Sequence, residues 1–430
     1  MPTVLLLNPP SLPGTTANRE GSAGMGALSE EADGFVYPPH LLATAAAVLR
    51  HARYRVAALD AQASGLTAEQ TLARLPAADV LVLPVSFATL AADRAFLNRL
   101  REVKPLLKVL AIGPALRYGQ VVHALNDLAD LLLAGEPELA LPAAVRRLLA
   151  GDLRPGSAVN PYTLAPAHYL ADGYLANLDE LPMPAWEVFL KAGRSYPFLS
   201  VLSSRGCPAG CRFCPYVAAQ GPVFRAQTPA RTVDELAYLQ ERFRPSHVVF
   251  RDPVFAHDRE RVLALCDEIR RRGLALSWEC ESRPEHFDEA LLAALRSAGC
   301  TTVKIGLETT DPELLVAIGR VGDGRAAAAY VRHAEAVIAL CRRLGILCRV
   351  FVMVGLPGQT LASAQRTAAD LRRMSPQRLH IKAYHWYPGI ALPRAEPADV
   401  DRQEAALRRA EAAPSLWRRV AARLRRGGHG

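Results

Sequence analysis

The length and composition of the sequence exclude several classes of protein. Its 430 residues exceed the roughly 250 to 300 at which a single hydrophobic core stops growing, so we expect two domains. Hydrophobic residues make up 50% of the chain and charged residues 22%, which gives enough apolar mass for folded cores and excludes wholesale disorder. The 8 cysteines are too sparse for a disulfide-stapled secreted domain, so their spacing matters more than their number.

Much of the formal net charge of +9 gathers at the end of the sequence, in a run of arginines without a nearby acid. Such a basic helical tail is typical of a solvated segment. The alternative is a contact with an acidic partner or with nucleic acid, which charge alone does not establish. The arginines are Arg418, Arg419, Arg423, Arg425 and Arg426.

The sequence shows no targeting or membrane signal. The apolar run within residues 1–8 has no basic segment before it and no small-residue cleavage site after it, unlike a signal peptide. No apolar run approaches the roughly 20 residues that a membrane-spanning helix needs. We therefore expect a soluble cytoplasmic protein.

Residues 1–150 alternate short β-branched runs with helical patterns, which is typical of a parallel sheet with crossover helices. Five strands in this alternation predict a flavodoxin-like doubly wound domain, whose ligand crevice lies beyond the carboxyl ends of its strands. The expected strands are 4–8, 55–60, 79–86, 108–113 and 129–135, and the expected helices are 41–53, 91–103 and 137–149.

Small or polar residues stand at the carboxyl ends of these strands. Asn8, Ser86, Gly113 and Gly135 would let a large flat ligand approach the backbone closely. The alternative is that they only form the loops that any such sheet needs. The residues alone do not separate these two interpretations.

Prolines and aromatic residues gather in 151–198, which indicates a linker that packs against its neighbours. A second alternating series begins at residue 199. Its six βα units predict a partial (β/α)6 barrel over 199–393 with its chemistry at the carboxyl face of the strands, followed by a short basic helical tail over 394–430. The expected strands are 199–203, 247–251, 275–281, 302–308, 346–354 and 378–386, with helices between them, for example over 232–243, 259–272, 288–298 and 328–344.

Two of the expected barrel strands carry charges where a barrel strand buried on both faces should be apolar. Lys304 and Glu308 share one face of the fourth strand, and Glu279 and Glu281 share one face of the third. If these faces point inward, they imply a wet, ligand-filled lumen. The alternative is that the strands lie at an open edge with these faces in water.

Cys207, Cys211 and Cys214 lie with C-x3-C-x2-C spacing in a Gly/Pro-rich loop directly after the first barrel strand. Three thiolates bind three irons of a cubane cluster and leave the fourth iron open to another ligand. Zinc is the rival metal, but a structural zinc site needs four protein ligands, and no cysteine or histidine follows closely enough. The spacing therefore predicts a [4Fe–4S] cluster.

The other five cysteines do not share this pattern. Cys266 and Cys341 fall within expected helices, and Cys300 and Cys348 at or in expected strands, which favours core packing. Cys280 follows Trp278 near a strand end, where a chemical role is the alternative to packing.

The cysteine loop resembles the signature of the radical S-adenosylmethionine (SAM) superfamily, and the resemblance extends over the whole second half of the chain. It implies that Cys207, Cys211 and Cys214 hold the cluster and that SAM binds the open iron through its amine and carboxylate. The residues that match cofactor contacts in relatives are Phe213 near the adenine, Asp252, Glu308, Gly355, Pro357 and Gly358. Asp252 stands where many relatives carry two acids, so its role stays open.

The order of the predicted elements indicates which branch of the superfamily the chain resembles. A doubly wound domain, then the segment 178–186, then the cysteine loop is similar to the cobalamin-binding branch of the superfamily. This implies a corrin above the barrel mouth, with Asn8, Ser86, Gly113 and Gly135 where the cobalamin-facing loops would be. The motif Asp-x-His-x-x-Gly, which supplies a histidine to cobalt in many cobalamin proteins, is absent from the sequence. The resemblance therefore implies cobalamin without that histidine, or a domain that keeps the fold without the cofactor.

The resemblance also implies a reaction, in which SAM is cleaved reductively to a 5′-deoxyadenosyl radical that removes a hydrogen from the substrate. An external electron donor such as flavodoxin or ferredoxin is implied. The resemblance to the cobalamin-binding branch favours methyl transfer from cobalamin to an unactivated carbon of a small-molecule or natural-product substrate. The alternatives are a radical cyclisation, oxidation or rearrangement without methyl transfer, and a non-catalytic cobalamin or metal sensor. A methylthiolating RNA enzyme is disfavoured, because no cysteine precedes Cys207.

Three residues near the carboxyl end of the last expected strand are candidates for lining the substrate pocket. They are Tyr384, His385 and Tyr387. For His385 the alternative is an ordinary hydrogen-bonded histidine, since no partner for chemistry is evident beside it.

Overall fold

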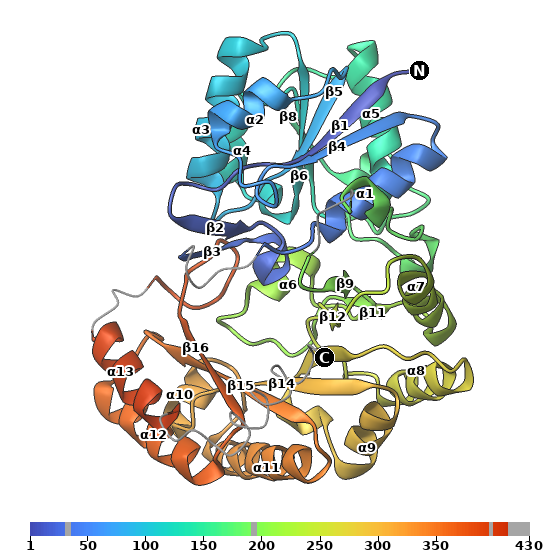
Figure 1. Ribbon diagram of the computed structural model, residues 1–430. Coiled ribbons are helices and arrows are strands. Elements are labelled where there is room, and N and C mark those ends of the chain that lie inside the picture. Colours follow the sequence, from blue (N-terminus) through green and yellow to red (C-terminus); the bar gives the residue numbers. More distant parts are fainter. Residues whose placement is uncertain (31–35, 191–195, 395–398, 412–430) are drawn as a thin grey trace, which may run out of the picture. The chain divides into compact units, whose positions relative to one another are not determined.

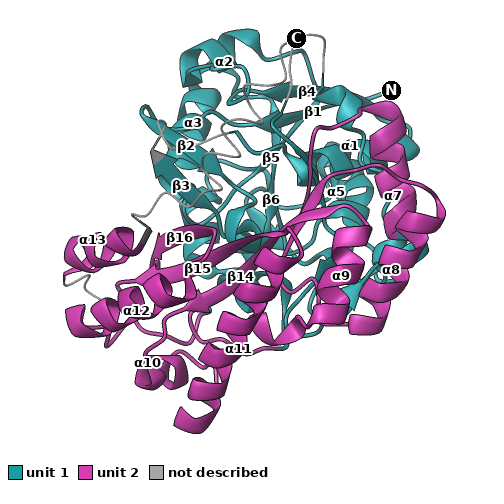
Figure 2. Ribbon diagram, turned by 60° about the horizontal axis from the view of Figure 1, so that its bottom comes forward, with its two compact units in different colours: residues 1–208, 215–231, 387–389 teal, residues 209–214, 232–386, 390–430 magenta. Residues whose placement is uncertain are grey.

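The computed structural model describes residues 1–30, 36–190, 196–394 and 399–411. The chain folds into two compact units, which Figure 2 colours separately. Unit 1 comprises Met1–Pro208, Pro215–Arg231 and Tyr387–Gly389, and unit 2 comprises Ala209–Cys214, Thr232–Trp386 and Ile390–Gly430. The five arginines predicted to form a basic tail, from Arg418 to Arg426, lie outside the described residues.

Unit 1 is built on a parallel sheet with strand order β4-β1-β5-β6-β7-β8. Its first five strands in the chain stand in the order 2-1-3-4-5, which is the order of a flavodoxin-like doubly wound fold. The predicted fold class is therefore confirmed, and a sixth strand extends one edge. The strands are β1 (Thr3–Asn8), β4 (Arg55–Asp60), β5 (Val80–Pro84), β6 (Lys108–Gly113), β7 (Leu131–Ala134) and β8 (Ser157–Val159).

Helices cover both faces of this sheet, with α1 and α5 on one face and α2, α3 and α4 on the other (Figure 1). Two of them were not predicted, because α2 and α4 are too short to show a helical period. The start of α2 carries a signal of its own, a capping box between Thr67 and Gln70. The helices are α1 (His40–His51), α2 (Ala68–Arg74), α3 (Leu90–Val103), α4 (Gly119–Leu125) and α5 (Leu141–Ala150).

A small hairpin, which the sequence did not predict, packs onto the carboxyl end of β5. It pairs β2 (Thr15–Asn18) with β3 (Ala27–Glu30) in antiparallel fashion, and a 3-10 turn, η1 (Gly21–Gly24), joins the two strands. The amide of Ala88 donates to the carbonyl of Met25 at 3.0 Å. Gly26 lies so close to the strand end that a Cβ there would be 2.1 Å from the hydroxyl of Ser86.

The segment expected to be a packed linker, 151–198, groups with unit 1. Besides β8 it forms three short 3-10 turns, and within it the side chains of Tyr169 and Trp186 are buried. The amide of Ala185 donates to the carbonyl of Ala43 in α1 at 2.9 Å. The turns are η4 (Pro161–Thr163), η5 (Leu178–Glu180) and η6 (Trp186–Val188).

All six strands predicted after residue 198 form. In unit 2, β12 to β16 pair as parallel strands in chain order, which gives the successive βα units of a partial barrel. The strands are β9 (Leu199–Val201), β12 (Val248–Phe250), β13 (Trp278–Ser282), β14 (Cys300–Glu308), β15 (Leu347–Val354) and β16 (Arg378–Ala383). A two-stranded hairpin of β10 (Ser204–Arg205) and β11 (Arg225–Ala226) flanks the cysteine loop.

The helices of unit 2 lie along the outer side of these strands (Figure 1). The strands bury alternate apolar side chains on that side, among them Val303, Ile305, Val350 and Val352. The helices of the second half are α6 (Pro215–Gln220), α7 (Pro229–Arg242), α8 (Arg259–Arg271), α9 (Glu289–Ser297), α10 (Pro312–Ala317), α11 (Gly324–Arg343), α12 (Leu361–Met374) and α13 (Val400–Glu411), with one 3-10 turn, η7 (Pro284–His286). Among the described residues, no helix is long and apolar enough to span a bilayer.

The strands that carry unexpected charges are not at an edge. β13 pairs with β12 and β14, and β14 pairs with β13 and β15, so the open-edge alternative is wrong. Glu279 and Lys304 form an ion pair across these two strands. Their side chains lie on the face opposite to Cys280 and Val303, which are fully buried. The charged face is therefore the inner face of the strands.

Candidate cofactor site

The loop that carries the three cysteines begins with a glycine that no other residue could replace without strain. Gly206 has φ of 78°, and a Cβ there would lie 2.0 Å from the carbonyl oxygen of Val223. The next amide, of Cys207, donates to the carbonyl of Gly221 at 3.1 Å. The backbone at the first cysteine is thus fixed by close contacts within unit 1.

A buried ion-pair network in unit 1 holds the hairpin in front of this loop. Arg225 donates to both carboxylate oxygens of Glu136 at 2.8 Å, and Arg205 donates to Glu138 at 2.7 Å. Burial alone would raise the pKa of Glu136, but Arg205 and Arg225 hold that pKa below its ordinary value. Glu136 and Glu138 follow β7 shortly after Gly135, and the sequence reasoning did not predict their ion pairs with Arg205 and Arg225.

In unit 2, two guanidinium groups meet the sulfur of the second cysteine. Arg283 and Arg320 each donate to the Cys211 sulfur at 3.3 Å. Positively charged donors stabilise negative charge on a sulfur, and the thiolate is the form that binds metal. Cys211 is therefore placed in surroundings suited to a metal-binding thiolate.

Neither arginine was predicted from the sequence. Arg283 follows β13 directly, so its place at the carboxyl end of a barrel strand was an available signal. Arg320 lies between α10 and α11 with no such signal, and the fold brings it to Cys211 across 109 positions of sequence. The hydroxyl of Tyr330, which accepts a hydrogen bond from Arg320 at 2.8 Å, helps to fix its guanidinium.

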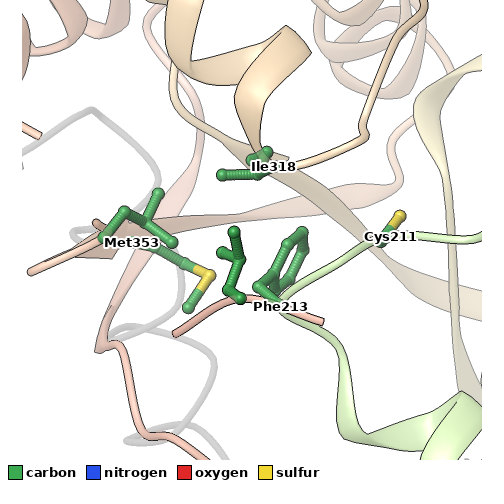
Figure 3. Packing of buried hydrophobic residues seen from close by; sticks show 6 residues of the cluster. Cys211, Phe213, Ile318 and Met353 are labelled. Atoms are coloured by element: carbon green, nitrogen blue, oxygen red, sulfur yellow. The ribbon is translucent and has the colours of Figure 1, made fainter. Parts of the chain in front are cut away.

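Phe213 lies in an apolar cluster at the carboxyl ends of the unit 2 strands. Figure 3 shows its ring between Cys211 and Met353, with Ile318 beside it. Leu356 and Leu392 complete the buried cluster. This arrangement brings Phe213 close to the segment around Gly355 that was predicted to contact the same cofactor, and it offers an apolar wall for a flat aromatic group.

Glu308, at the end of β14, has an unusual backbone conformation. Its φ is 66°, in the left-handed region that costs free energy for a non-glycine residue, and the β14–β15 register shifts between Gly306 and Glu308. Its carboxylate lies 3.9 Å from the guanidinium of Arg320. Burial raises the pKa of Glu308 above its ordinary value, against the attraction of Arg320.

Gly306 makes room for this pair of side chains. A Cβ at Gly306 would lie 2.4 Å from a carboxylate oxygen of Glu308 and 2.8 Å from a guanidinium nitrogen of Arg320. Glu308 and Arg320 therefore meet over a strand position where any larger side chain would displace one or both of their end groups. The structure thus connects Glu308, which was predicted, with Cys211 through Arg320, which was not.

The segment 355–358, predicted to contact SAM, is hydrogen-bonded to its neighbours at its start and exposed to solvent at its end. The amide of Gly355 donates to the side chain of Gln403, in α13, at 2.9 Å. Gln359 donates to the carbonyl of Met353 at 3.0 Å. Pro357 is half-buried and Gly358 is exposed. Asp252, the remaining predicted residue of this group, is buried directly after β12.

The four residues predicted to face cobalamin all lie at carboxyl ends of unit 1 strands, and two of them use their side chains within the protein. The amide of Asn8 donates to Asp60 at 3.0 Å and accepts from Gln62 at 3.2 Å. The hydroxyl of Ser86 lies 2.6 Å from that of Thr89, within a buried chain of hydrogen bonds. Any ligand contact at these two positions therefore competes with contacts made by the chain itself.

The two glycines of this group lie against backbone and side-chain atoms. A Cβ at Gly113 would be 2.8 Å from the carbonyl oxygen of Val85, and one at Gly135 would be 3.1 Å from the guanidinium of Arg117. Both glycines have positive φ. Their need for glycine is explained by the fold, so their assignment to a cofactor stays a prediction.

The candidate pocket residues after β16 divide between the two units. Tyr384, in unit 2, packs beside the Phe213 cluster, and its hydroxyl donates to the carbonyl of Pro393 at 2.9 Å. Tyr387 belongs to unit 1, where its hydroxyl donates to the carbonyl of Gly26 at 2.9 Å. His385 is exposed.

The donor set fits an iron–sulfur cluster better than a single ion. Among the described residues, no three His, Cys, Asp or Glu side chains converge closely enough to bind one metal ion. A cubane does not require such convergence, because each thiolate binds a different iron. Five of the eight cysteines lie elsewhere, and all five, including Cys280 beside Cys300, are buried in the core. The three loop cysteines remain the predicted ligands.

Comparison with known families finds a match for the second half of the chain. Residues 201–371 match the family described as the radical SAM superfamily. This part of the chain, which contains the three-cysteine loop, therefore matches the radical SAM superfamily. The relationship that the cysteine loop predicted is confirmed.

Several curated relatives are methyltransferases by name. An uncharacterized methyltransferase of Pyrococcus horikoshii is 27% identical over 222 residues, which cover 51% of this chain and 47% of that protein. Tryptophan 2-C-methyltransferase of Streptomyces laurentii is 31% identical over 182 residues, which cover 38% of this chain and 28% of that protein. The chain thus spans about half the length of the curated relatives it matches, or less.

Two solved structures resemble the chain over almost its whole length. One is the radical SAM methyltransferase TsrM from Kitasatospora setae with cobalamin and a [4Fe–4S] cluster bound, at a TM-score of 0.67 and 18% identity, covering 90% of this chain and 73% of that chain. The other is the cobalamin-dependent SAM radical enzyme OxsB, at a TM-score of 0.62 and 16% identity, covering 96% of this chain and 55% of that chain. These likenesses confirm the predicted fold, a doubly wound domain followed by a radical SAM barrel.

Proposed function

We propose that this protein is a cobalamin-dependent radical SAM methyltransferase that acts on an unactivated carbon of a small-molecule or natural-product substrate. The observation that carries the proposal is the sulfur of Cys211 between the guanidiniums of Arg283 and Arg320, in a three-cysteine loop of the radical SAM family. The methyltransferase names of relatives and the likeness to TsrM support the choice of reaction.

The chain's own residues would hold the cofactors. When bound, the cluster supplies the electron that cleaves SAM, and cobalamin supplies the methyl group. Cys207, Cys211 and Cys214 would ligate the cluster, and Arg283 and Arg320 would stabilise the charge on one ligand.

The remaining predicted residues of unit 2 would position SAM. The ring of Phe213 and the segment with Gly355, Pro357 and Gly358 would contact the adenine. Glu308 would contact SAM at the end of β14. The apolar cluster around Phe213 would exclude water from the reacting atoms. We propose no more specific role for Asp252.

We further propose an assignment of domains along the chain. Residues 1–150 would form the cobalamin-binding domain, with Asn8, Ser86, Gly113 and Gly135 at its ligand edge. Residues 151–198 would be the linker, 199–393 the radical SAM barrel and 394–430 a tail. The likeness to TsrM and OxsB, whose structures hold cobalamin, supports the first assignment.

The proposed reaction needs a one-electron reductant, for which we propose a flavodoxin or a ferredoxin. We also propose a cytoplasmic location. All eight cysteines are free thiols in the structure, which suits a reducing compartment.

The test is anaerobic reconstitution of the whole protein followed by absorption spectroscopy and product analysis. We expect both an iron–sulfur and a corrin spectrum, and a product heavier by one methyl group. A cluster without a corrin spectrum would remove cobalamin from the proposal. A product without added mass would favour a cyclisation, oxidation or rearrangement, and absence of SAM cleavage under reducing conditions would favour a non-catalytic sensor.

A further inference from the structure

The inner face of the last two strands of unit 2 carries a row of basic side chains. In the β14–β15–β16 register, Lys304 pairs with Arg349 and Arg349 pairs with Arg378, while Met353 pairs with Lys382. Paired residues on adjacent strands point to the same face of a sheet, and so do residues two apart on one strand. Arg349, Arg378, His380 and Lys382 therefore share one face, which we term the cationic face.

The side-chain contacts agree with this placement. The ammonium of Lys382 lies 4.3 Å from the centre of the Phe351 ring, and the same ring lies 5.1 Å from the imidazole of His380. Burial, with the nearby charges of Lys382 and Arg349, lowers the pKa of His380 to about 4. The imidazole is therefore neutral near pH 7 and can donate one hydrogen bond without adding charge.

The acids of the same inner face are already occupied or lie on other strands. Glu279 pairs with Lys304 and lies 3.6 Å from His247, and Glu308 faces Arg320. Glu281 stands on β13, beside Lys304 and two strands away from β15. Neither β15 nor β16 contains an acidic residue.

Within the described ranges, three cations of the cationic face consequently have no carboxylate within ion-pair distance, and Arg349 and Lys382 act on Glu279 and Glu308 only from further away. In the part of the chain that the structure describes, Arg349, Arg378 and Lys382 make no ion pair with a carboxylate. Arg349 and Arg378 are directly opposite each other, and like charges in that position destabilise a sheet. An arrangement that repels itself is stabilised when an anion binds between the charges.

We propose that the cationic face binds an anionic group of the substrate, a carboxylate or a phosphate. The two guanidiniums, paired across β15 and β16, offer the forked donors that match these oxyanions, and Lys382, four residues further along β16, adds a positive charge to the same face. Phe351 lies within the same row and offers an apolar surface to the rest of the ligand. The inference rests on the proposed function for assigning the anion to a substrate, and it extends that function by naming the substrate's charge.

The test uses the reconstituted whole protein with inorganic phosphate and acetate as probes, and measures binding by titration calorimetry. Replacing a charged hydrogen-bonding partner weakens binding by about tenfold or more. We expect that loss for Arg349→Gln and for Lys382→Gln, and near-normal binding for Lys382→Arg. The control is Arg271→Gln, since Arg271 is an exposed cation of α8 paired with Glu268 and remote in sequence from the face. Whichever of the two probes binds tighter identifies the oxyanion.

The same titrations in saturating SAM separate a substrate site from a cofactor site. Binding that persists with SAM present supports the proposal, whereas displacement by SAM would assign the face to the methionyl carboxylate and overturn it. Equal affinities for the parent protein and the Gln variants would also overturn it. SAM cleavage is followed in the same samples, so that a failure of the proposed radical chemistry is seen independently of anion binding.

Discussion

Unit 1 and unit 2 each contain a group of arginines on buried or half-buried positions, and the two groups differ in what they contact. In unit 1, Arg205 and Arg225 meet the carboxylates of Glu138 and Glu136, so that every charge is balanced. In unit 2, Arg283 and Arg320 meet the sulfur of Cys211. Arg283 also pairs with Glu285, and Arg320 lies 3.9 Å from Glu308. The unit 1 group therefore holds the backbone in place, whereas the unit 2 group adds charged donors to a sulfur that can bind metal.

The largest expected effect comes from removing the thiol on which the unit 2 arginines converge. Cys211→Ala should abolish cluster assembly and SAM cleavage, because two remaining thiolates leave a second iron without a protein ligand. Iron and sulfide analysis of the reconstituted protein measures this. Cys341→Ala, at a buried core cysteine, is the matched control and should keep a full cluster. A full cluster in Cys211→Ala would contradict the ligand assignment.

The balanced group should show its effect in stability. Glu136→Ala leaves Arg225 with uncompensated buried charge, while Arg205 keeps Glu138, and breaking such a pair costs about 3 to 5 kcal/mol. Urea unfolding of the whole protein, followed by circular dichroism, gives the change in the free energy of unfolding. Glu69→Ala, at an exposed position of α2, should change it by less than about 0.5 kcal/mol. Equal values for the two variants would refute a structural role for the network.

These two groups also mark the limit of prediction from the sequence. The flavodoxin-like fold of unit 1 follows from the β-α alternation, and the cysteine spacing predicts the metal ligands, because both signals are local. The arginines on Cys211 come from positions 72 and 109 residues away. The acids that hold Arg205 and Arg225 lie 67 and 89 residues away. Charged contacts at such separations depend on the fold, and no local pattern encodes them.

The same reasoning explains the other elements that were missed. The β2–β3 hairpin and the short helices α2 and α4 are too brief for a periodic pattern, and α13 contributes Gln403 to the segment at Gly355 from a stretch that read only as a tail. Conversely, Gly113 and Gly135 were correctly placed at strand ends, but their packing within the fold accounts for a glycine there without any ligand.

An intermediate effect is expected where Glu308 and Arg320 approach each other. Gly306→Ala puts a methyl group into the space of both side chains, and overpacking of this kind costs about 1 to 3 kcal/mol. If this displaces Glu308 from SAM, SAM affinity should fall by about tenfold, as measured by equilibrium dialysis. Gly322→Ala is the control, because a Cβ at Gly322 would meet no atom within 4 Å. Unchanged SAM affinity in Gly306→Ala would separate Glu308 from SAM binding.

The smallest effect distinguishes a buried acid from an exposed one with the same pKa. The pKa of Glu279 is about 2, because His247 and Lys304 outweigh the opposing effect of burial, and the pKa of Glu268 is also about 2, because it accepts hydrogen bonds from Arg271 and Arg272. A depressed carboxyl pKa stabilises the fold above the ordinary value of about 4.5, and this contribution is lost as the pH falls from there towards 2.

Unfolding free energies of Glu279→Gln and Glu268→Gln should therefore diverge. The Glu279→Gln variant should be less stable than the parent protein at pH 7, and the difference should shrink as the pH falls below about 4.5. It should persist in 1 M salt, where screening extends over about 3 Å, since the ion pair of Glu279 with Lys304 is largely buried. Any effect of Glu268→Gln should be much weaker in the same salt, because its ion pairs with Arg271 and Arg272 lie at the surface of α8, where the Glu268 side chain is partly exposed. Equal salt sensitivity of the two variants would mean that the inner face of β13 and β14 is as open to solvent as the outer surface of α8.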